Sequence, residues 1–492
     1  MTTITFDTLS ANILRPGVLQ EIAESATQIE TGNRPNRVLL VGYRSSNGSV
    51  AALTPRKPTR ISQAQDYFGA TSMLAKKFAA FWEIHQRFKV TCIAVDEPSS
   101  GTKATKTLTF TGTATEAGII HLYIDGIYVP VSVASGDAAA DVATAVQTAL
   151  AARTDLQMTS SVSSGVVTLS ANHKGVHGNH HDVRVNYRQD EDNQTLPAGI
   201  SLAIADGTAG SGVIDITTIT AVMGDSPYEL IVQPFSDSQA LSDWEEELQR
   251  RWGDDENLNS VMMVPVFGTH SANTTLAEGL NTQFICPLSL PSNIPATPWE
   301  VAARVGAIET NVNDIEVGRP CQRQVVPNTL VPNEEHRFTG AEREAQLQAG
   351  LSTFYVDDFG KLRIERLRAT YKRNSAGEDD YRFRDFVVMR MLQAMRYDWQ
   401  RRIHLKFADW KFASDNNAGG PGKRVVTPNV LKAEALFQFD DWFDEVLVQD
   451  RDQYKKDLRA IALSDTQAAM ILPPHLIGQF RQVLTRVQPI VK

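Results

Sequence analysis

The sequence predicts a multidomain protein of mixed α/β and α+β class, with a layered α/β core, an inserted β-rich α+β domain and extended arms at both ends. Two observations support this fold class. Apolar runs at 37–43 and 89–95 enclose a segment with helical spacing at 73–88, which is the order of a βαβ unit. Near residue 98 the pattern changes to short alternating strands rich in threonine and glycine, so a second domain is expected to begin there.

The α/β pattern returns after the inserted domain, with apolar runs at 228–234 and 260–266 on either side of a helical segment at 243–252. A chain of 492 residues is long enough for roughly three or four domains. The predicted segments are an N-terminal arm at 1–30, the first part of the core at 31–97, the inserted domain at 98–205, the second part of the core at 206–345, a C-terminal domain at 346–480 and a C-terminal arm at 481–492. Since a domain is inserted most easily at a surface, we expect the inserted domain to face outward.

Both ends of the chain carry apolar residues that are too few to bury a face of their own. These residues are Val18, Leu19 and Ile22 near the start, and Val483, Leu484, Val487 and Ile490 near the end. The C-terminal set alternates as in a β-strand, but no partner strand lies nearby in the sequence. We therefore interpret both ends as arms. The clearest amphipathic helix is predicted between them, at 381–404.

The composition excludes several classes of protein. Hydrophobic residues make up 42% and charged residues 21% of the chain, as in soluble globular proteins. The formal charge of −9 is mild for this length, so no general affinity for nucleic acid or anionic membranes is expected. Cys92, Cys286 and Cys321 lack C-x-x-C spacing, which argues against a disulfide framework or a zinc knuckle. The first residues lack the features of a signal peptide, and no run is long enough to span a bilayer, so a cytoplasm-like compartment and no direct membrane insertion are expected.

The tripeptide Asp358-Phe359-Gly360 matches the metal-binding motif of protein kinases. It lies between two strand-like runs, 353–356 and 362–366, which predicts a β-hairpin with a glycine in its turn. The other kinase motifs, a glycine-rich loop, a strand lysine and an H-R-D loop, are not present in order. We interpret the tripeptide as part of a scaffold.

Four of the ten histidines lie in the short stretch 173–182. His177, His181 and Asp182 are candidate metal ligands, because imidazoles and a carboxylate suit zinc and similar ions. The stretch is rich in glycine and has no helix to hold two histidines one turn apart, so a connecting loop is the favoured interpretation. A metal-dependent hydrolase that uses this cluster remains the alternative.

No other motif supports catalysis or cofactor binding. The segment 419–424 resembles a phosphate-binding loop but has Asn417 where the first glycine belongs and Arg424 where a serine or threonine belongs. The paired carboxylates Asp357-Asp358 and Asp440-Asp441 lie in contexts typical of solvated surfaces. The sequence therefore predicts no catalytic residue, no cofactor and no metal.

Charged residues are unevenly distributed in the last third of the chain. A basic region contains Arg363, Arg366 and Arg368, and an acidic region contains Asp440, Asp441 and Asp444. These residues either pair with neighbours inside one chain or form contacts between copies. A contact between a basic and an acidic surface would be head-to-tail, which builds rings or helical filaments.

Several short motifs, taken in order, resemble those of contractile-phage tail sheath proteins, most closely the Mu-like branch. Residues 15–22 resemble the P-G-V-Y-V-E-E start of sheaths, with Leu19 and Gln20 in place of the usual tyrosine and valine. Residues 349–352, the following hairpin and residues 366–371 resemble the hairpin that leads to an R-x-x-T motif in sheaths. The resemblance extends to the helix that begins after Gly136-Asp137 and to His173-Lys174-Gly175.

The resemblance implies a mechanical function without an enzymatic step. In sheaths of this kind the arms add strands to the C-terminal domains of neighbours and so link the subunits of stacked six-fold rings. These rings surround a tail tube. Contraction then drives the tube through the host envelope for genome ejection. The implied partners are further copies of the chain, the tail tube protein, and the baseplate and tail terminator proteins. The implied location is the virion, after assembly in the host cytoplasm. A cytoplasmic binding module that forms ordinary dimers is a further alternative.

Overall fold

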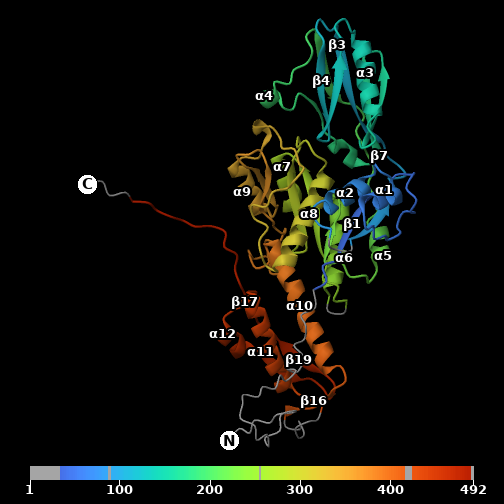
Figure 1. Cartoon of the computed structure of the whole chain (residues 1–492). Coiled ribbons are helices and arrows are strands. Elements are labelled where there is room, and N and C mark those ends of the chain that lie inside the picture. The colour runs from blue at the N-terminus through green and yellow to red at the C-terminus, as the bar shows by residue number, and fades with distance from the viewer. Residues whose placement is uncertain (1–33, 87–89, 254–255, 416–423, 489–492) are drawn as a thin grey trace, which may run out of the picture. The chain divides into compact units, whose positions relative to one another are not determined.

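The computed structural model describes residues 34–86, 90–253, 256–415 and 424–488 (Figure 1). Four of the predicted arm residues, Val18, Leu19, Ile22 and Ile490, lie outside these residues. Within the described parts of the chain, no helix is both long and apolar enough to cross a membrane.

The core is built on a five-stranded sheet whose strands are all parallel. The strands are β1 (Val38–Tyr43), β2 (Val90–Val95), β10 (Leu230–Val232), β11 (Val261–Gly268) and β12 (Ile285–Pro291). Their order is β12-β11-β10-β1-β2. Every residue of β1 and β2 is buried, as continuous apolar runs predict for a sheet that is covered on both faces.

Helices cover both faces of this sheet. They are α1 (Ile61–Phe68), α2 (Met73–Trp82), α5 (Thr217–Met223), α6 (Ser238–Trp252), α7 (His270–Glu278) and α8 (Pro298–Ile315). Helix α8 packs closely on β10 at Gly306, where a Cβ atom would lie 2.7 Å from Val232 Cγ2. Helix α2 ends at Trp82, earlier than the predicted end at residue 88, because the Ile84 and His85 amides both bond to the carbonyl of Phe81 and close the last turn.

The residues between β2 and β10 form two antiparallel sheets with their own hydrophobic core (Figure 1). One sheet has the order β6-β7-β3-β9 and consists of β3 (Lys103–Gly112), β6 (Met158–Ser163), β7 (Val166–Lys174) and β9 (Ile200–Asp206). The other has the order β5-β4-β8 and consists of β4 (Gly118–Ile124), β5 (Ile127–Val133) and β8 (Val183–Val185). Helix α3 (Ala139–Ala151), helix α4 (Gln189–Asp192) and the 3-10 helix η1 (Val176–His180) complete this part. We call it the inserted domain, because it interrupts the sequence between two strands of one sheet.

After α8 the chain adds more structure to the core. The 3-10 helix η2 (Glu334–His336) and α9 (Gly340–Ala349) precede the hairpin of β13 (Thr353–Val356) and β14 (Leu362–Arg366). Both strands coincide with the predicted runs at 353–356 and 362–366. Phe354 and Ile364 of this hairpin pack into the core of the central sheet.

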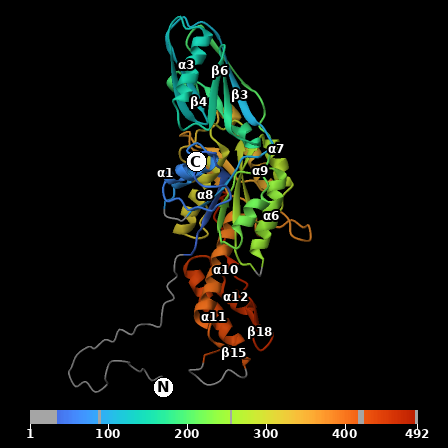
Figure 2. The same ribbon diagram turned by 90° about the vertical axis from the view of Figure 1, so that its right-hand side faces the viewer.

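The remaining elements form a second packing unit, which we call the C-terminal module (Figure 2). It contains α10 (Phe386–Phe407), α11 (Pro428–Asp444), α12 (Arg451–Asp457) and three short strand pairs. The pairs are β15 (Lys411–Phe412) with β16 (Val425–Val426), β17 (Val448–Gln449) with β20 (His475–Leu476), and β18 (Arg459–Ala462) with β19 (Ala468–Ile471). The mixed α/β and α+β multidomain class is thus confirmed.

Helix α10 belongs to two hydrophobic cores. Phe386 and Met389 pack into the core of the central sheet, whereas Met391 and Met395 pack with residues of α11 and α12. Arg390 lies between these two sets and is buried. Its guanidinium donates to Glu309 Oε1 at 2.8 Å and to Asn36 Oδ1 at 2.6 Å. The helix therefore connects the C-terminal module to the central sheet through both packing and a buried ion pair.

Candidate functional site

The first place to look for a ligand site is the carboxyl edge of the central sheet, between β1 and β10. In open α/β sheets the crevice at this edge, where the strand order reverses, is the usual binding site. Here the reversal occurs between β1 and β10, which are neighbours in space although the inserted domain separates them in the sequence. Tyr43 ends β1 and Phe235 follows β10.

The inserted domain fills this crevice with its histidine-rich segment. The His177 ring lies 5.6 Å from the ring of Tyr43 and 5.0 Å from the ring of Phe235. The His173 ring lies 5.4 Å from Tyr43, and His173 Nε2 accepts a hydrogen bond of 3.3 Å from the Met73 amide at the start of α2. Gly175 allows this close approach, because it has a φ of +120° and a Cβ atom there would lie 2.9 Å from Tyr43 Oη. The crevice is thus occupied by the protein itself.

Three histidines of this segment have lowered pKa values because of their surroundings. Burial lowers the pKa of His177 to about 3, with further contributions from the positive charges of His180, Lys77 and His173. Burial also lowers the pKa of His173 and of His180 to about 4. The His180 ring lies 4.4 Å from the ring of Phe267, at an interplanar angle of 35°. These contacts are the aromatic packing expected of a docking joint between two domains.

The three candidate metal ligands of the alternative interpretation do not converge. His177 packs on aromatic rings, and His181 Nδ1 lies 2.7 Å from Asp125 Oδ2. Asp182 accepts two hydrogen bonds from Arg184, of 2.6 and 2.7 Å. Among the residues that the structure describes, no group of three or more histidine, cysteine, aspartate or glutamate side chains is arranged to hold a metal ion. Nothing in the geometry of this segment favours the metal-dependent hydrolase.

A buried lysine joins the two central strands below the crevice. Lys77 Nζ donates to the carbonyl oxygens of Val41, at 2.7 Å, and Val232, at 3.1 Å. Complete burial lowers the pKa of Lys77 to about 7 and raises the pKa of Cys92 above its usual range. Because the amine is enclosed and donates to two carbonyls, its contribution is to bond β1 to β10 rather than to react.

Polar contacts complete the docking of the inserted domain. Gln157 Nε2 donates to Glu300 Oε1 at 2.7 Å, and the Trp299 indole donates to Gln157 Oε1 at 3.1 Å. The Lys174 amide donates to Glu97 Oε2 at 2.8 Å. We call the contact of 173–181 with Tyr43 and Phe235, together with these bonds, the docking joint. The sequence indicated the histidine cluster, but only the fold shows that the cluster faces the end of β1.

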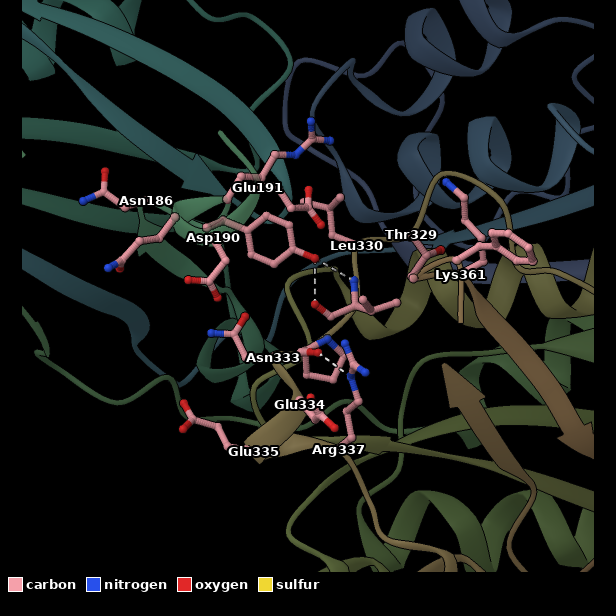
Figure 3. A pocket seen from close by; sticks show the side chains of 17 residues that line it. Asn186, Asp190, Glu191, Thr329, Leu330, Asn333, Glu334, Glu335, Arg337 and Lys361 are labelled. Atoms are coloured by element: carbon pink, nitrogen blue, oxygen red, sulfur yellow. Dashed lines mark hydrogen bonds between the residues drawn. The ribbon is translucent and has the colours of Figure 1, made fainter. Parts of the chain in front are cut away.

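A groove of about 870 Å³ lies between the inserted domain and the loop after α8 (Figure 3). Tyr187 connects its two sides, since Tyr187 Oη donates to the Val331 carbonyl at 2.8 Å and accepts from the Val331 amide at 3.2 Å. Its lining carries charges of both signs: Asp190, Glu191, Glu334 and Glu335 against Arg188, Arg337 and Lys361. The lining contains no histidine, cysteine or serine.

The tripeptide Asp358-Phe359-Gly360 borders this groove and forms the turn of the β13–β14 hairpin. Asp357 Oδ1 accepts from the amides of Phe359, at 3.0 Å, and Lys361, at 2.8 Å. Gly360 adopts the left-handed conformation with φ of +68°. Asp358 is exposed, and the Phe359 ring is 84% exposed. The carboxylate that organises the turn is therefore that of Asp357, and the tripeptide is arranged as a turn.

Most of the candidate charge contacts pair inside the chain. Arg363 pairs with Asp357, and Arg366 binds Asp385 through two hydrogen bonds of 2.8 and 2.9 Å. Arg368 is buried, donates to the Leu347 carbonyl and has its pKa lowered to about 10 by burial. The acidic candidates divide in the same way. Asp440 pairs with Arg451 and Asp441 with Arg402, whereas Asp444 is exposed and has no ion pair among the described residues.

Exposed apolar side chains gather in the C-terminal module and the segment that follows it. They include Leu405, Phe437, Phe443, Val446, Ile461, Leu463, Ile471, Phe480, Val483, Leu484 and Val487. Leu484 is 88% exposed. Residues 482–488 belong to no helix or strand (Figure 1). Apolar side chains left open to this extent on a folded protein mark an interaction surface.

Comparison with known proteins relates the chain to phage tail sheaths. The family of the phage tail sheath protein beta-sandwich domain matches residues 99–223, and that of the phage tail sheath protein central domain matches residues 209–370. The chain is similar to the Mu-like prophage FluMu tail sheath protein of Haemophilus influenzae, with 29% identity over 448 residues and 91% of each chain covered.

Two solved structures of sheath tail proteins are similar to this one. That from Listeria innocua has a TM-score of 0.50 and 12% identity, and the match covers 90% of this chain and 92% of that chain. That from Desulfitobacterium hafniense has a TM-score of 0.47 and 14% identity, and the match covers 94% of this chain and 100% of that chain. The similarity to the Listeria innocua structure shows that this chain and that protein share a common fold.

Proposed function

The chain belongs to the phage tail sheath family and is a structural sheath subunit of the Mu-like type, and from this premise we propose that it forms stacked six-fold rings around a tail tube and contracts. Contraction would drive the tube through the host envelope for genome ejection. The proposed partners are further copies of the chain, the tail tube protein, and the baseplate and tail terminator proteins. The proposed location is the virion, after assembly in the host cytoplasm, and we propose no catalytic activity.

The observation that carries the proposal is the open surface of the C-terminal module. In the described part of the chain β18 and β19 pair only with each other, and Ile461, Leu463 and Ile471 on and beside them are exposed. An isolated pair of strands is only marginally stable in water, and its edges present unpaired backbone groups. We propose that this pair receives the arms of neighbouring copies as added strands.

The arms supply the matching chemistry. Val483, Leu484 and Val487 are exposed, and residues 482–488 form no hydrogen bond to the rest of the described chain. Together with Ile490, and with Val18, Leu19 and Ile22 at the other end, they provide apolar side chains that an added strand can bury against a neighbour. Backbone hydrogen bonds would give the affinity, and the apolar side chains would fix the register.

Contraction would then move rigid bodies. We propose that the central sheet with its docked inserted domain moves as one body, because the docking joint is closed by packing and hydrogen bonds. The arms would stay paired with the strands of neighbouring copies while other contacts between copies change. Among the charged candidates, we propose that Asp444 and the exposed pair of Asp440 with Arg451 take part in contacts that change on contraction. Exposed pairs of this kind are weak and are easily exchanged.

Deletion of residues 481–492 tests the proposal. The deleted residues belong to no hydrophobic core among the described residues, so the variant is expected to remain folded, with an unchanged circular dichroism spectrum. Electron microscopy across a range of salt and protein concentrations is expected to show hollow tubes for the full chain and none for the variant. Tubes of normal length and six-fold end views from the variant would refute the role of the arm.

A further inference from the structure

Arg481, the first residue of the predicted C-terminal arm, is fastened to the body of its own chain. Its Nη2 atom lies 3.2 Å from Asp385 Oδ1. Arg481 also donates to the side chain of Gln479, whose own amide donates to the Gly318 carbonyl at 2.9 Å. In the described part of the arm beyond Arg481, no hydrogen bond reaches the rest of the chain. The boundary between attached and free chain therefore falls at Arg481.

The partner carboxylate lies at a junction of three elements. Asp385 occupies the residue before the first turn of α10, and its side chain does not cap the helix. Arg366 from β14 binds Asp385 through two hydrogen bonds, and Arg384 Nε lies 3.7 Å from Asp385 Oδ2. Burial acts to raise the pKa of Asp385, but the hydrogen bonds from Arg366 and the charges of the three arginines outweigh it and lower that pKa. One carboxylate thus serves three guanidinium groups.

The sharing of the Asp385 carboxylate among three arginines determines how firmly Arg481 is held. Arg366 binds the carboxylate with two of its nitrogens, Nε and Nη2, whereas Arg481 binds with one nitrogen at a longer distance. Both side chains of the Arg481–Asp385 pair are partly buried. A partly buried pair is screened by salt less than an exposed one, yet it is weaker here than a bidentate pair would be. The contact is suited to fix the position of the arm without joining it permanently to the core.

We propose that the Arg481–Asp385 pair is the root of the C-terminal arm, and that it sets the point from which the arm reaches a neighbouring copy. This inference rests on the proposed function and assigns a positioning role within it. The attachment before this pair is the bond of the Ile477 amide to the Leu447 carbonyl, together with the contact of Gln479. An extended chain spans about 3.3–3.6 Å per residue, so loss of this pair, with Gln479 as the next attachment, would free about 7 Å of chain. A displacement of that size destroys the register of an added strand.

Limited digestion of the full chain with trypsin tests the root directly in the unassembled protein. Cleavage after Arg481 requires the Arg481–Asp385 pair to break, whereas Arg486 is exposed and serves as an internal reference. In Asp385→Asn the ratio of cleavage after Arg481 to cleavage after Arg486 is expected to rise about tenfold, since the partly buried ion pair with Arg481 is lost while a side chain of the same size is kept. An unchanged ratio would overturn the proposal.

Arg366→Gln is the matched control. It removes the other guanidinium from the same carboxylate and leaves Arg481 with its partner. The ratio of cleavage is therefore expected to stay the same or to fall. A rise as large as that in Asp385→Asn would show that general loosening of this junction, and not the Arg481 pair, controls the arm, and would also overturn the proposal.

Assembly provides a second readout that separates this inference from the proposed function. Arg481→Gln is expected to give few tubes, of irregular width, and Arg481→Lys, which keeps the charge, is expected to restore most of the ordered tubes. Normal tubes from Arg481→Gln, combined with no tubes from the deletion of 481–492, would refute the root and leave the arm function standing. Normal tubes from the deletion itself would refute the arm function.

Discussion

The docking joint and the C-terminal module differ in how much apolar surface they leave exposed to solvent. At the docking joint the inserted domain covers the carboxyl edge of the central sheet, and the buried groups there are packed or hydrogen-bonded. In the C-terminal module apolar side chains such as Ile461 and Phe437 are left in contact with solvent. A surface that a chain closes by itself serves its own fold, whereas a surface it leaves open needs a partner. The contrast therefore supports the proposal that contacts between copies lie at the C-terminal module.

The largest effect on folding is expected at the closed surface. Tyr43→Ala removes a fully buried ring that contacts His173, His177 and Phe235, so the free energy of unfolding should fall by about 3–5 kcal/mol. Urea unfolding measures this change. Tyr128→Ala on the exposed face of the inserted domain is the matched control and should cost less than about 1 kcal/mol. Equal losses in both variants would contradict the distinction between closed and open surfaces.

Acid is expected to loosen the docking joint next. The pKa of His177 is about 3 in the folded protein against the ordinary 6.5, so the unfolded state binds more protons below pH 6.5. The contribution of neutral His177 to the free energy of unfolding is therefore complete above about pH 6.5 and is lost as the pH falls toward the folded pKa. From pH 7 to pH 5 this histidine alone lowers the free energy of unfolding by roughly 2 kcal/mol. Urea titrations at both pH values test this, and His177→Gln should show a pH dependence smaller by about that amount. The same pH dependence in His177→Gln and the natural protein would assign the effect to other groups.

At the open surface the expected effect on folding is small, but the effect on assembly is large. Ile461→Lys on β18 places a charge where a neighbour's strand is proposed to pair, so tubes should be lost while the free energy of unfolding changes by less than about 0.5 kcal/mol. Ile119→Lys on the inserted domain is a control of the same kind, because Ile119 is 45% exposed and Ile461 is 57% exposed. Tubes formed by Ile461→Lys would show that β18 is not the acceptor strand.

The smallest effect is expected at the turn of the β13–β14 hairpin. Phe359→Ser should change the free energy of unfolding by less than about 0.5 kcal/mol, because the ring is almost fully exposed and the turn is held by Asp357. Magnesium ions should not shift the melting temperature of either protein. A shift that Asp358→Asn abolishes would show that the tripeptide binds a metal after all.

Sequence reasoning located regular structure best where one pattern dominated. The apolar runs at 37–43 and 89–95 coincide with β1 and β2, and the β13–β14 hairpin lies at the predicted positions. Helix ends were located less well. The predicted helix at 381–404 begins at Phe386 and ends at Phe407, because Asp380 is engaged with Tyr371 and Arg382 in a turn before the helix. Such hydrogen bonds between side chains in a turn leave no periodic signal in a sequence.

The candidate site residues show the same limit. Charge clustering drew attention to Arg366 and Asp440, yet the sequence left open whether they pair inside the chain. The structure gives them Asp385 and Arg451 as partners. Arg481 was placed at the start of the arm, but its contact with Asp385 joins residues 96 positions apart in the sequence and has no local signature.

By itself the sequence determined the alternation of buried strands and helices, the interruption near residue 98 and the unpaired character of the C-terminal arm, because these follow from local patterns of apolar residues. Only the tertiary structure decided that the histidine cluster closes the carboxyl edge of the sheet, that α10 is shared by two cores and that Asp385 holds the arm. Those arrangements depend on which surfaces meet, and the free energy of such contacts comes from residues that are far apart along the chain.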